Sequence, residues 1–171
     1  IRPYGISAYT YLLNKFAPAP KSAAIQLGNA ANQFLDDCVN EESVTDGEEH
    51  DNESYLQSLR KSFSTFPIVY TILEDIDQQF FEQCQHQFNN IKKTIRESFS
   101  TAEVDIKNTD VQLEPSFVCE ALGIQGRMDL LTTDYKKIIE LKSGKAEEYP
   151  YRHPRLEHCL QMALYKEILY H

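Results

Sequence analysis

A single stretch of the sequence, residues 126–142, constrains the fold more than any other. It reads GRMDLLTTDYKKIIELK, two short and largely apolar segments separated by a polar turn at residues 132–135. This pattern is typical of a β-hairpin. Strand side chains alternate between two faces, so every second residue should point to the same side. The predicted rows are Arg127, Asp129 and Leu131 on the first strand, Ile138, Glu140 and Lys142 on the second, and Ile139 and Leu141 on the opposite, buried face.

Pairing the two strands brings Asp129 and Glu140 together at the edge of a sheet, with Lys142 beside them. Two carboxylates and an ammonium group in one place are costly to desolvate. A hard divalent cation gives such a cluster a purpose, since Mg²⁺ prefers oxygen ligands and is often held by one or two carboxylates and a substrate phosphate. The cluster therefore predicts a metal site in which Lys142 orients a water molecule and helps to deprotonate it.

The order of these residues resembles a known family. Asp129 followed by Glu140-Leu141-Lys142 resembles the D…ExK core of the PD-(D/E)XK nuclease superfamily. Downstream, Gln161 and Tyr165 are similar to the QxxxY helix of its RecB-like branch. That branch includes the nuclease modules of helicase–nucleases and the CRISPR-associated RecB-type exonucleases. The resemblance covers residues 27–37 and 111–170.

The resemblance implies a fold and a set of roles. The fold is α/β with a restriction-endonuclease-like core, a small mixed β-sheet of about four strands flanked by helices, and a largely helical N-terminal half. Asp129, Glu140 and the backbone carbonyl of Leu141 would hold Mg²⁺ or Mn²⁺. Gln161 and Tyr165 would hold the lysine or the nucleic acid in register.

Two further positions have counterparts in the family, and each has two interpretations. Glu114 matches a glutamate that the family often carries on the preceding strand, so it is either a direct or water-mediated metal group or an ordinary strand-edge carboxylate. Asn32, four residues after Gly28, stands where the family commonly has a metal-binding histidine. Because an amide is a poor metal ligand beside an imidazole, this helix either packs closely on its neighbours or brings Asn32 to a water or a DNA phosphate.

Four residues near the second strand and the last helix are candidates for nucleic-acid contact. Lys145 ends a Ser-Gly-Lys turn that suits a phosphate. Tyr151 and Arg152 lie in a loop, where they either stack on unpaired bases or only pack within the loop. His158 precedes the QxxxY pair at helical spacing, so it faces either the same site or solvent.

Helical periodicity in the apolar residues accounts for much of the remaining chain. A strand interrupted at Pro115 is expected within residues 103–120, ahead of the hairpin. The expected helices span residues 23–39, residues 54–63, residues 69–99, either continuous or joined at Asn89-Asn90, and residues 154–170.

The same periodicity predicts two helix faces. The last helix should bury one apolar face, which consists of Leu156, Leu160, Leu164 and Ile168. The 69–99 helix should carry three basic residues on its solvent side, where they either solubilise the helix or follow a phosphate backbone: Lys92, Lys93 and Arg96.

The net charge of −9 is unusual for a protein that contacts nucleic-acid phosphates, since such contacts favour Lys and Arg. The excess is local. Residues 36–53 contain nine acidic residues and no Lys or Arg, which leaves the rest of the chain neutral. Residues 40–53 are expected to form an acidic loop, either solvated or in contact with a partner. A neutral body is compatible with a nuclease, because a bound metal carries positive charge to the phosphate.

The length of 171 residues fits a single domain over residues 1–171, and the start at Ile1 leads us to expect part of a longer protein. The four cysteines are widely spaced, which argues against a disulfide framework or a zinc site and favours a reducing cytoplasm. No apolar run reaches the length of a membrane span. Some relatives hold an iron–sulfur cluster through a cysteine trio after the QxxxY helix. No such trio follows Tyr165, so no cluster is expected within this sequence.

Together these features predict a Mg²⁺-dependent deoxyribonuclease that acts, with exonuclease action favoured, on single-stranded or free-ended DNA in replication, repair or recombination. A helicase domain in the same chain or in a partner chain is an expected companion. The alternative is a catalytically inactive DNA-binding or assembly module of a helicase–nuclease. The blandest interpretation is an α/β domain with a coincidental pair of surface carboxylates.

Overall fold

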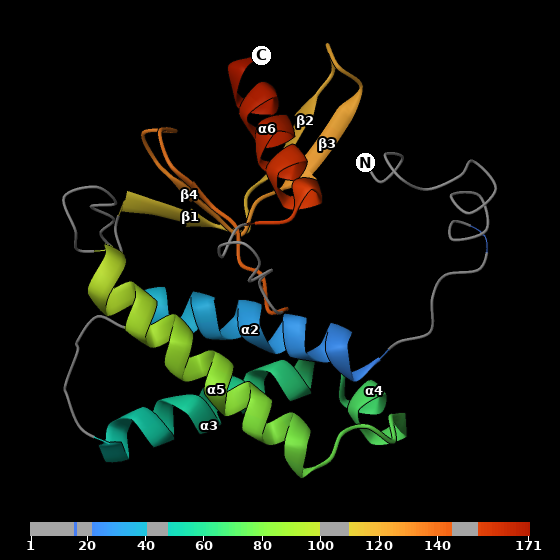
Figure 1. Ribbon diagram of the computed structural model, residues 1–171, viewed down its shortest axis with the longest axis vertical. Coiled ribbons are helices and arrows are strands. Elements are labelled where there is room, and N and C mark those ends of the chain that lie inside the picture. Colours follow the sequence, from blue (N-terminus) through green and yellow to red (C-terminus); the bar gives the residue numbers. More distant parts are fainter. Residues whose placement is uncertain (1–15, 17–21, 41–47, 100–109, 145–153) are drawn as a thin grey trace.

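The computed structural model describes residue 16 and residues 22–40, 48–99, 110–144 and 154–171. Its helices α2 to α5 form one layer, and five short strands with helix α6 form a second layer above it (Figure 1). The N-terminal half is therefore helical and the strands lie in the C-terminal part, which confirms the predicted α/β class.

Helix α2, Ala23–Asn40, confirms the predicted helix over residues 23–39. Ser22 caps it, because its Oγ accepts a hydrogen bond of 3.4 Å from the backbone nitrogen of Ile25. Small and apolar residues recur at helical spacing and put Ala30, Ala31 and Phe34 at zero exposure. The small residues let neighbouring elements approach this helix closely, so α2 is the centre of the helical layer.

Helix α3, Glu48–Thr65, begins well before the predicted helix over residues 54–63. The prediction of an acidic loop over residues 40–53 is therefore wrong from Glu48 onward, and residues 41–47 lie outside the described residues. Tertiary contacts stabilise this acidic first turn, because Asp51 accepts from Lys92 on the next long helix and from Arg96 in the π-helical turn that continues it. Pro67 opens helix α4, Pro67–Ile72, at a position where its missing N–H costs nothing.

Helix α5, Gln78–Thr94, continues into a π-helical turn, η1, Ile95–Phe99. The predicted helix over residues 69–99 is thus two helices, and the break lies at residues 73–77 instead of Asn89-Asn90. Leu73 is extended, and Asp77 restarts the helix by accepting at Oδ1 from the backbone nitrogen of Phe80 at 3.0 Å. The capping carboxylate of Asp77 is a start signal that outweighs the unbroken apolar periodicity.

Lys92 of α5 is not on the solvent side as predicted, because only 8% of its surface is exposed. Its Nζ lies 2.6 Å from Oδ1 of Asp51, and Arg96 reaches the same oxygen at 3.4 Å. Lys93 does remain exposed and lies 4.0 Å from Glu97. The prediction of a solvent-side basic row is therefore wrong for Lys92, whose charge ties α5 to α3.

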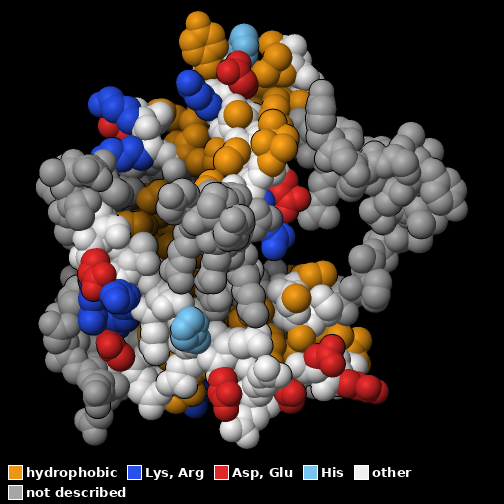
Figure 2. All heavy atoms as spheres, viewed as in Figure 1, with side chains coloured by type: hydrophobic (Ala, Val, Ile, Leu, Met, Phe, Trp, Pro, Cys, Tyr) orange, Lys and Arg blue, Asp and Glu red, His pale blue; other side chains and the backbone are white. Residues whose placement is uncertain are grey.

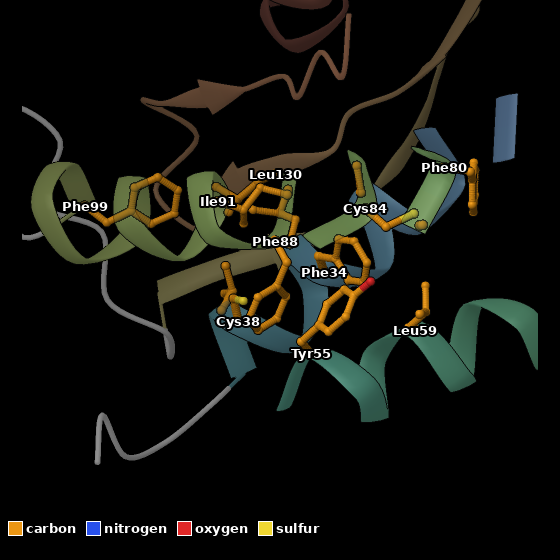
Figure 3. Close-up of a cluster of buried hydrophobic side chains, with 14 of the residues drawn as sticks. Phe34, Cys38, Tyr55, Leu59, Phe80, Cys84, Phe88, Ile91, Phe99 and Leu130 are labelled. Carbon is orange, nitrogen blue, oxygen red and sulfur yellow. The ribbon is translucent and has the colours of Figure 1, made fainter. Parts of the chain in front are cut away.

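The helices enclose the first of two apolar clusters (Figure 3). One aromatic ring from each of α2, α3 and α5 meets at its centre: the centroids of Phe34 and Phe88 are 5.5 Å apart, and those of Tyr55 and Phe88 are also 5.5 Å apart. Edge-to-face and tilted rings at these separations are favourable arrangements. Leu130 enters this cluster from the strands, so the helical layer supports the sheet from below.

The strands pair into two small sheets, with order β1-β4-β5 in one and β2-β3 in the other. Every described pairing is antiparallel, so the expected single mixed sheet of about four strands is wrong in this detail. The strand bounds are β1 Val111–Leu113, β2 Ser116–Cys119, β3 Ile124–Arg127, β4 Leu130–Thr132 and β5 Ile138–Ile139.

The two sheets share one continuous register. Leu113 lies opposite Leu130 in the first sheet, and Ser116 lies opposite Arg127 in the second, so no residue is gained or lost between them. At the junction, the backbone nitrogen of Glu114 donates to Asp129 O at 3.0 Å, and that of Met128 donates to Pro115 O at 3.1 Å. The strand expected around Pro115 is thus one arm of a long hairpin, interrupted there as predicted.

This junction changes which residues share a face. Leu130 belongs to the first apolar cluster, whereas Met128 and Leu131 both belong to a second cluster on the other side of the sheet. Regular alternation would separate Met128 from Leu131. The predicted single row of Arg127, Asp129 and Leu131 is therefore wrong, because the strand bends at Met128-Asp129 and its alternation shifts by one residue.

Helix α6, Leu156–Tyr170, packs against β2 and β3 and begins two residues after the predicted Pro154. The predicted buried face is wrong for Leu156 and Leu160, which are 75% and 41% exposed. The prediction is confirmed for Ile168, which is buried together with Tyr165 because both residues meet the hairpin. Exposed apolar side chains consequently gather over α6 on the face shown in Figure 2.

None of the described helices has the length and apolar character that crossing a bilayer requires.

Candidate active site

The β4–β5 hairpin brings Asp129 and Glu140 together, as the sequence predicts. Leu130 lies opposite Ile139, so the next pair outward is Asp129 and Glu140. Oδ2 of Asp129 accepts a hydrogen bond of 2.7 Å from the backbone nitrogen of Leu141, which fixes the two strand ends against each other. The predicted turn at residues 132–135 closes this hairpin, with the backbone nitrogen of Tyr135 donating to Thr132 O at 2.9 Å.

Lys142 and the QxxxY pair meet Glu140 in one hydrogen-bonded network. Lys142 Nζ donates to Glu140 Oε1 at 2.7 Å and to Gln161 Oε1 at 3.0 Å. Gln161 Nε2 donates to Glu140 Oε1 at 2.6 Å and to Tyr165 Oη at 2.7 Å. Tyr165 Oη in turn donates to the carbonyl oxygen of Arg127 at 2.6 Å. Side chains from the segment after β5 and from α6 are therefore joined to one another and to the backbone of β3.

The directions of these bonds are mutually consistent. The amide of Gln161 presents its oxygen to an ammonium and its NH₂ group to a carboxylate and a hydroxyl. Reversing the amide would set oxygen against the carboxylate of Glu140 and NH₂ against Lys142, so the network admits one orientation. Burial raises the pKa of Tyr165, and the charges of Glu140 and Asp129 raise it further, against the hydrogen bond from Gln161. Tyr165 is therefore held as a neutral donor.

Glu114 lies opposite Asp129 at the bend between the two sheets. Its φ of 49° is in the left-handed region, which a residue with a Cβ rarely adopts. Arg127 lies near it, with its Nη2 3.4 Å from Glu114 Oε1. Strained backbone of this kind concentrates at functional sites. The continuous register puts Glu114, Asp129 and Glu140 in one row across three strands.

Asp129 shows the electrostatic consequence of this row. Burial raises its pKa, and the negative charges of Glu140 and Glu114 raise it further. The hydrogen bond from Leu141 and the charge of Lys142 act in the opposite direction but do not cancel the effect. A positive charge beside Asp129 would relieve this repulsion.

Glu140 provides a direct test of whether the site fits a cation. Its side chain is 10% exposed, and both of its donors, from Lys142 and Gln161, bind Oε1. Oε2 is buried without a hydrogen-bond partner among the described residues. An unpaired carboxylate oxygen in such a place is costly unless a ligand satisfies it. The residues present therefore fit a divalent cation held through Asp129 and Glu140.

Within the described ranges, no three His, Cys, Asp or Glu side chains form a group that could hold a metal ion by themselves. The backbone carbonyl of Leu141 as a further ligand remains a prediction, and so does Glu114.

Sequence reasoning missed one acidic residue of this region, Asp36 of α2. Burial raises its pKa from 3.8 to about 6, with further contributions from the negative charges of Glu114, Asp37 and Asp129, against Arg127. Asp36 therefore faces the carboxylate row from the helical layer. The sequence contains a signal for this placement, because Asp36 lies one helical turn after Asn32, within the stretch 27–37 that resembles the family.

A second missed contact holds the segment that follows Lys142. Gln87 of α5 donates from Nε2 to the carbonyl oxygen of Ser143 at 3.1 Å. On α2, a Cβ built on Gly28 would lie 3.6 Å from the Ser143 hydroxyl, so this strand end runs close to the helix. No periodicity argument links residues so far apart in the sequence.

The remaining candidates are not joined to this network. Asn32 is half-buried on α2, and His158 is partly exposed on α6, with its Nε2 3.7 Å from Glu157. A role for either at the site stays a prediction. Lys145, Tyr151 and Arg152 lie outside the described residues.

Comparison with known proteins places the chain in a family. The sequence model of the PD-(D/E)XK nuclease superfamily matches residues 7–171, which is nearly the whole chain, and the protein therefore belongs to this superfamily. Membership suggests nuclease activity on DNA, and nucleases of this superfamily typically use divalent metals. Neither the comparison with curated proteins nor that with solved structures finds a match.

Proposed function

We propose that the protein is a Mg²⁺-dependent deoxyribonuclease whose site is the carboxylate row at the end of the β4–β5 hairpin. The observation that carries the proposal is the buried, unpartnered Oε2 of Glu140 beside the raised-pKa carboxyl of Asp129. Both features are unfavourable without a cation and are explained by one. Superfamily membership supplies the reaction class, hydrolysis of a phosphodiester bond.

Asp129 and Glu140 would hold the metal, with the Leu141 carbonyl and Glu114 as further candidate ligands. A bound divalent cation supplies Lewis-acid polarisation of the phosphate and a lowered pKa for a coordinated water. Lys142 is anchored by Glu140 and Gln161 through two of its three donors, which leaves one for the attacking water or a phosphoryl oxygen. A fixed ammonium donor at that point stabilises negative charge as it develops.

The network also supports assignment to the RecB-like branch. Gln161 and Tyr165 are one helical turn apart on α6 and are hydrogen-bonded to each other and to the site. This gives the QxxxY pair a role in positioning Lys142. We propose on this basis that the protein acts on free-ended or single-stranded DNA as an exonuclease in replication, repair or recombination. The protein would work beside a helicase domain, in the cytoplasm and as a single domain of a longer protein.

The test uses end-labelled single- and double-stranded DNA with Mg²⁺, with Mn²⁺ and with EDTA. Asp129→Ala and Lys142→Ala should abolish cleavage while the circular dichroism spectrum and the unfolding transition are retained. Asp134→Ala and Lys136→Ala are matched controls, because both residues lie in the exposed turn at the far end of the same hairpin. Full activity in EDTA, or in both site variants, contradicts the proposal.

The second candidate is a DNA-binding or assembly module without cleavage. The observation that favours it is Asn32, which stands where the family commonly has a metal-binding histidine. This function predicts DNA binding that weakens steeply with salt and yields no metal-dependent product. The same gel series, run at two salt concentrations with a binding assay in parallel, separates the two functions.

A further inference from the structure

On the other side of the network, helix α6 and strand β3 approach each other closely at Gly126. Helix α6 lies so near β3 that a Cβ built on Gly126 would be 2.8 Å from Cε1 and 3.1 Å from Cδ1 of Tyr165. The same atom would lie 3.2 Å from Cδ1 of Ile168. Separations below 3.0 Å between carbon atoms are repulsive. Only glycine fits at this point of the strand without displacing the helix.

The two side chains that face Gly126 have little freedom to yield. Tyr165 and Ile168 are each 7% exposed and belong to the second apolar cluster, which also contains Met128 and Leu131. Close-packed neighbours transmit a displacement instead of absorbing it. An added methyl group at Gly126 would therefore move the Tyr165 ring, and with it the α6 backbone, away from β3.

Tyr165 is the first side chain in the chain of hydrogen bonds that ends at Lys142. Its Oη reaches the carbonyl oxygen of Arg127, the residue next to Gly126, at 2.6 Å, and receives Gln161 Nε2 at 2.7 Å. Gln161 then meets both Glu140 and Lys142. A displacement of a few tenths of an ångström at Tyr165 changes every later bond, because hydrogen bonds weaken steeply with distance and angle.

We propose that Gly126 is a positioning residue for cleavage: its missing side chain seats the Tyr165 ring on β3 and thereby sets where Gln161 holds Lys142. The inference rests on the proposed nuclease function. Gly126 itself has no contact with substrate in this proposal. It lies two positions before Met128 on β3, on the face that packs against α6.

The first measurement is steady-state cleavage of end-labelled DNA by Gly126→Ala. We expect kcat to fall by about tenfold or more while KM for DNA changes by less than about twofold, because misplacement of a catalytic group by under 1 Å affects the chemical step most. The matched control is Gly123→Ala in the same hairpin. Its Cβ would meet no described atom within 4 Å, while its φ of 64° makes the substitution mildly destabilising. Gly123→Ala should therefore lower the unfolding temperature and leave kcat unchanged.

The second measurement needs no cleavage. The side-chain amide protons of Gln161, both hydrogen-bonded, should be shifted in ¹⁵N–¹H NMR spectra of the unsubstituted protein, and Gly126→Ala should move them where Gly123→Ala does not. If the unsubstituted protein cleaves no DNA, the proposed function fails. The Gln161 resonances still test whether Gly126 sets the position of the Tyr165 ring on β3. Wild-type kcat together with unmoved Gln161 resonances in Gly126→Ala overturns the proposal.

A third variant covers the case in which Gly126→Ala does not fold. Tyr165→Ala removes the ring that the new methyl group would strike. In that background Gly126→Ala should cost a much smaller further loss in unfolding temperature than in the original background, because only the 3.2 Å approach to Ile168 remains. Equal losses in both backgrounds mean that the ring and the glycine are uncoupled, which overturns the inference.

Discussion

The helical layer and the strand layer of this protein differ in how they pack and in how they accommodate buried charge. The helical layer buries three aromatic rings against one another around Phe34 and satisfies its buried lysine, Lys92, with Asp51. The strand layer instead contains a glutamate with left-handed backbone conformation, Glu114. It also contains a carboxylate oxygen of Glu140 that has no hydrogen-bond partner among the described residues. Unfavourable features of the kind found at active sites are thus concentrated in the strand layer, although α2 also carries one buried carboxylate oxygen, Oδ2 of Asp37, without a hydrogen-bond partner among the described residues.

The contact between the layers shows how the second tolerates these features. Leu130 of β4 enters the apolar cluster of the helices, while its neighbour Asp129 belongs to the carboxylate row. The strand that carries the site is thus anchored by one residue, and the next residue carries a half-buried carboxyl group with a raised pKa. This arrangement predicts that substitutions in the two layers should separate activity from stability.

The largest difference between loss of activity and loss of stability is expected for Glu140→Gln. The change removes the charge that Lys142 and the proposed metal require, so cleavage should fall on the order of 1000-fold. Stability should change by less than about 1 kcal/mol, because the new amide oxygen still accepts from Lys142 and Gln161. Cleavage rates and urea unfolding of the same preparation measure both effects. A large loss of stability together with retained cleavage would contradict the view that this residue of the strand layer serves activity and not stability.

Phe34→Ala tests the helical layer. The ring is fully buried at the centre of the first cluster, so its loss should destabilise the protein by about 3–5 kcal/mol through lost burial and a residual cavity. The folded fraction should keep its kcat, because Phe34 belongs to the first apolar cluster and takes no part in the hydrogen-bonded network described for the site. The measurement is denaturant unfolding, with activity scaled to the folded fraction. A loss below about 1 kcal/mol would mean that the aromatic cluster does not dominate the stability of this layer.

Asp36→Asn tests the boundary between the layers. The pKa of Asp36 is raised to about 6, so the folded state favours the protonated carboxyl. Without metal, the protein should lose stability as pH rises from about 4 to about 6, and the asparagine variant should lack that part of the slope. The difference should be about 1 kcal/mol after allowance for solvent screening. Parallel unfolding curves of both proteins across this pH range would contradict the placement of Asp36 beside Glu114 and Asp129.

The smallest effect is expected for Leu156→Ser. Although the residue lies on the helix that carries Gln161 and Tyr165, it is 75% exposed. Stability should therefore change by less than about 0.5 kcal/mol, and cleavage should be unaffected. Thermal unfolding measures the first effect and the gel assay the second. A loss of stability above about 1 kcal/mol would indicate that Leu156 is buried, as helical periodicity predicts for the apolar face of α6.

Local patterns predicted much of the fold and the centre of the site. The hairpin between Asp129 and Glu140 followed from alternation and a polar turn, both of which depend only on neighbouring residues. The pairing of Gln161 with Tyr165 followed from helical spacing, and apolar periodicity gave the helix over residues 23–39.

The errors arose where distant residues decide the outcome. The first turn of α3 is helical because α5 brings Lys92 to Asp51, and no local signal contains that information. Leu156 is exposed because α6 turns Tyr165 toward Gly126, a contact between residues far apart in the chain. Asp36 was missed for the same reason, because its raised pKa depends on its burial in the fold and on the negative charges of Glu114 and Asp129, which are distant in the chain.

The continuous register across the bend has a consequence for how the chain folds. The turn between Cys119 and Ile124 is short, and pairing can proceed from it by adding one residue pair at a time. Such zipping reaches Leu113 opposite Leu130 without any long loop having to close. Two of the proposed catalytic acids, Glu114 and Asp129, would therefore be neighbours early, before α6 docks and completes the network around Lys142.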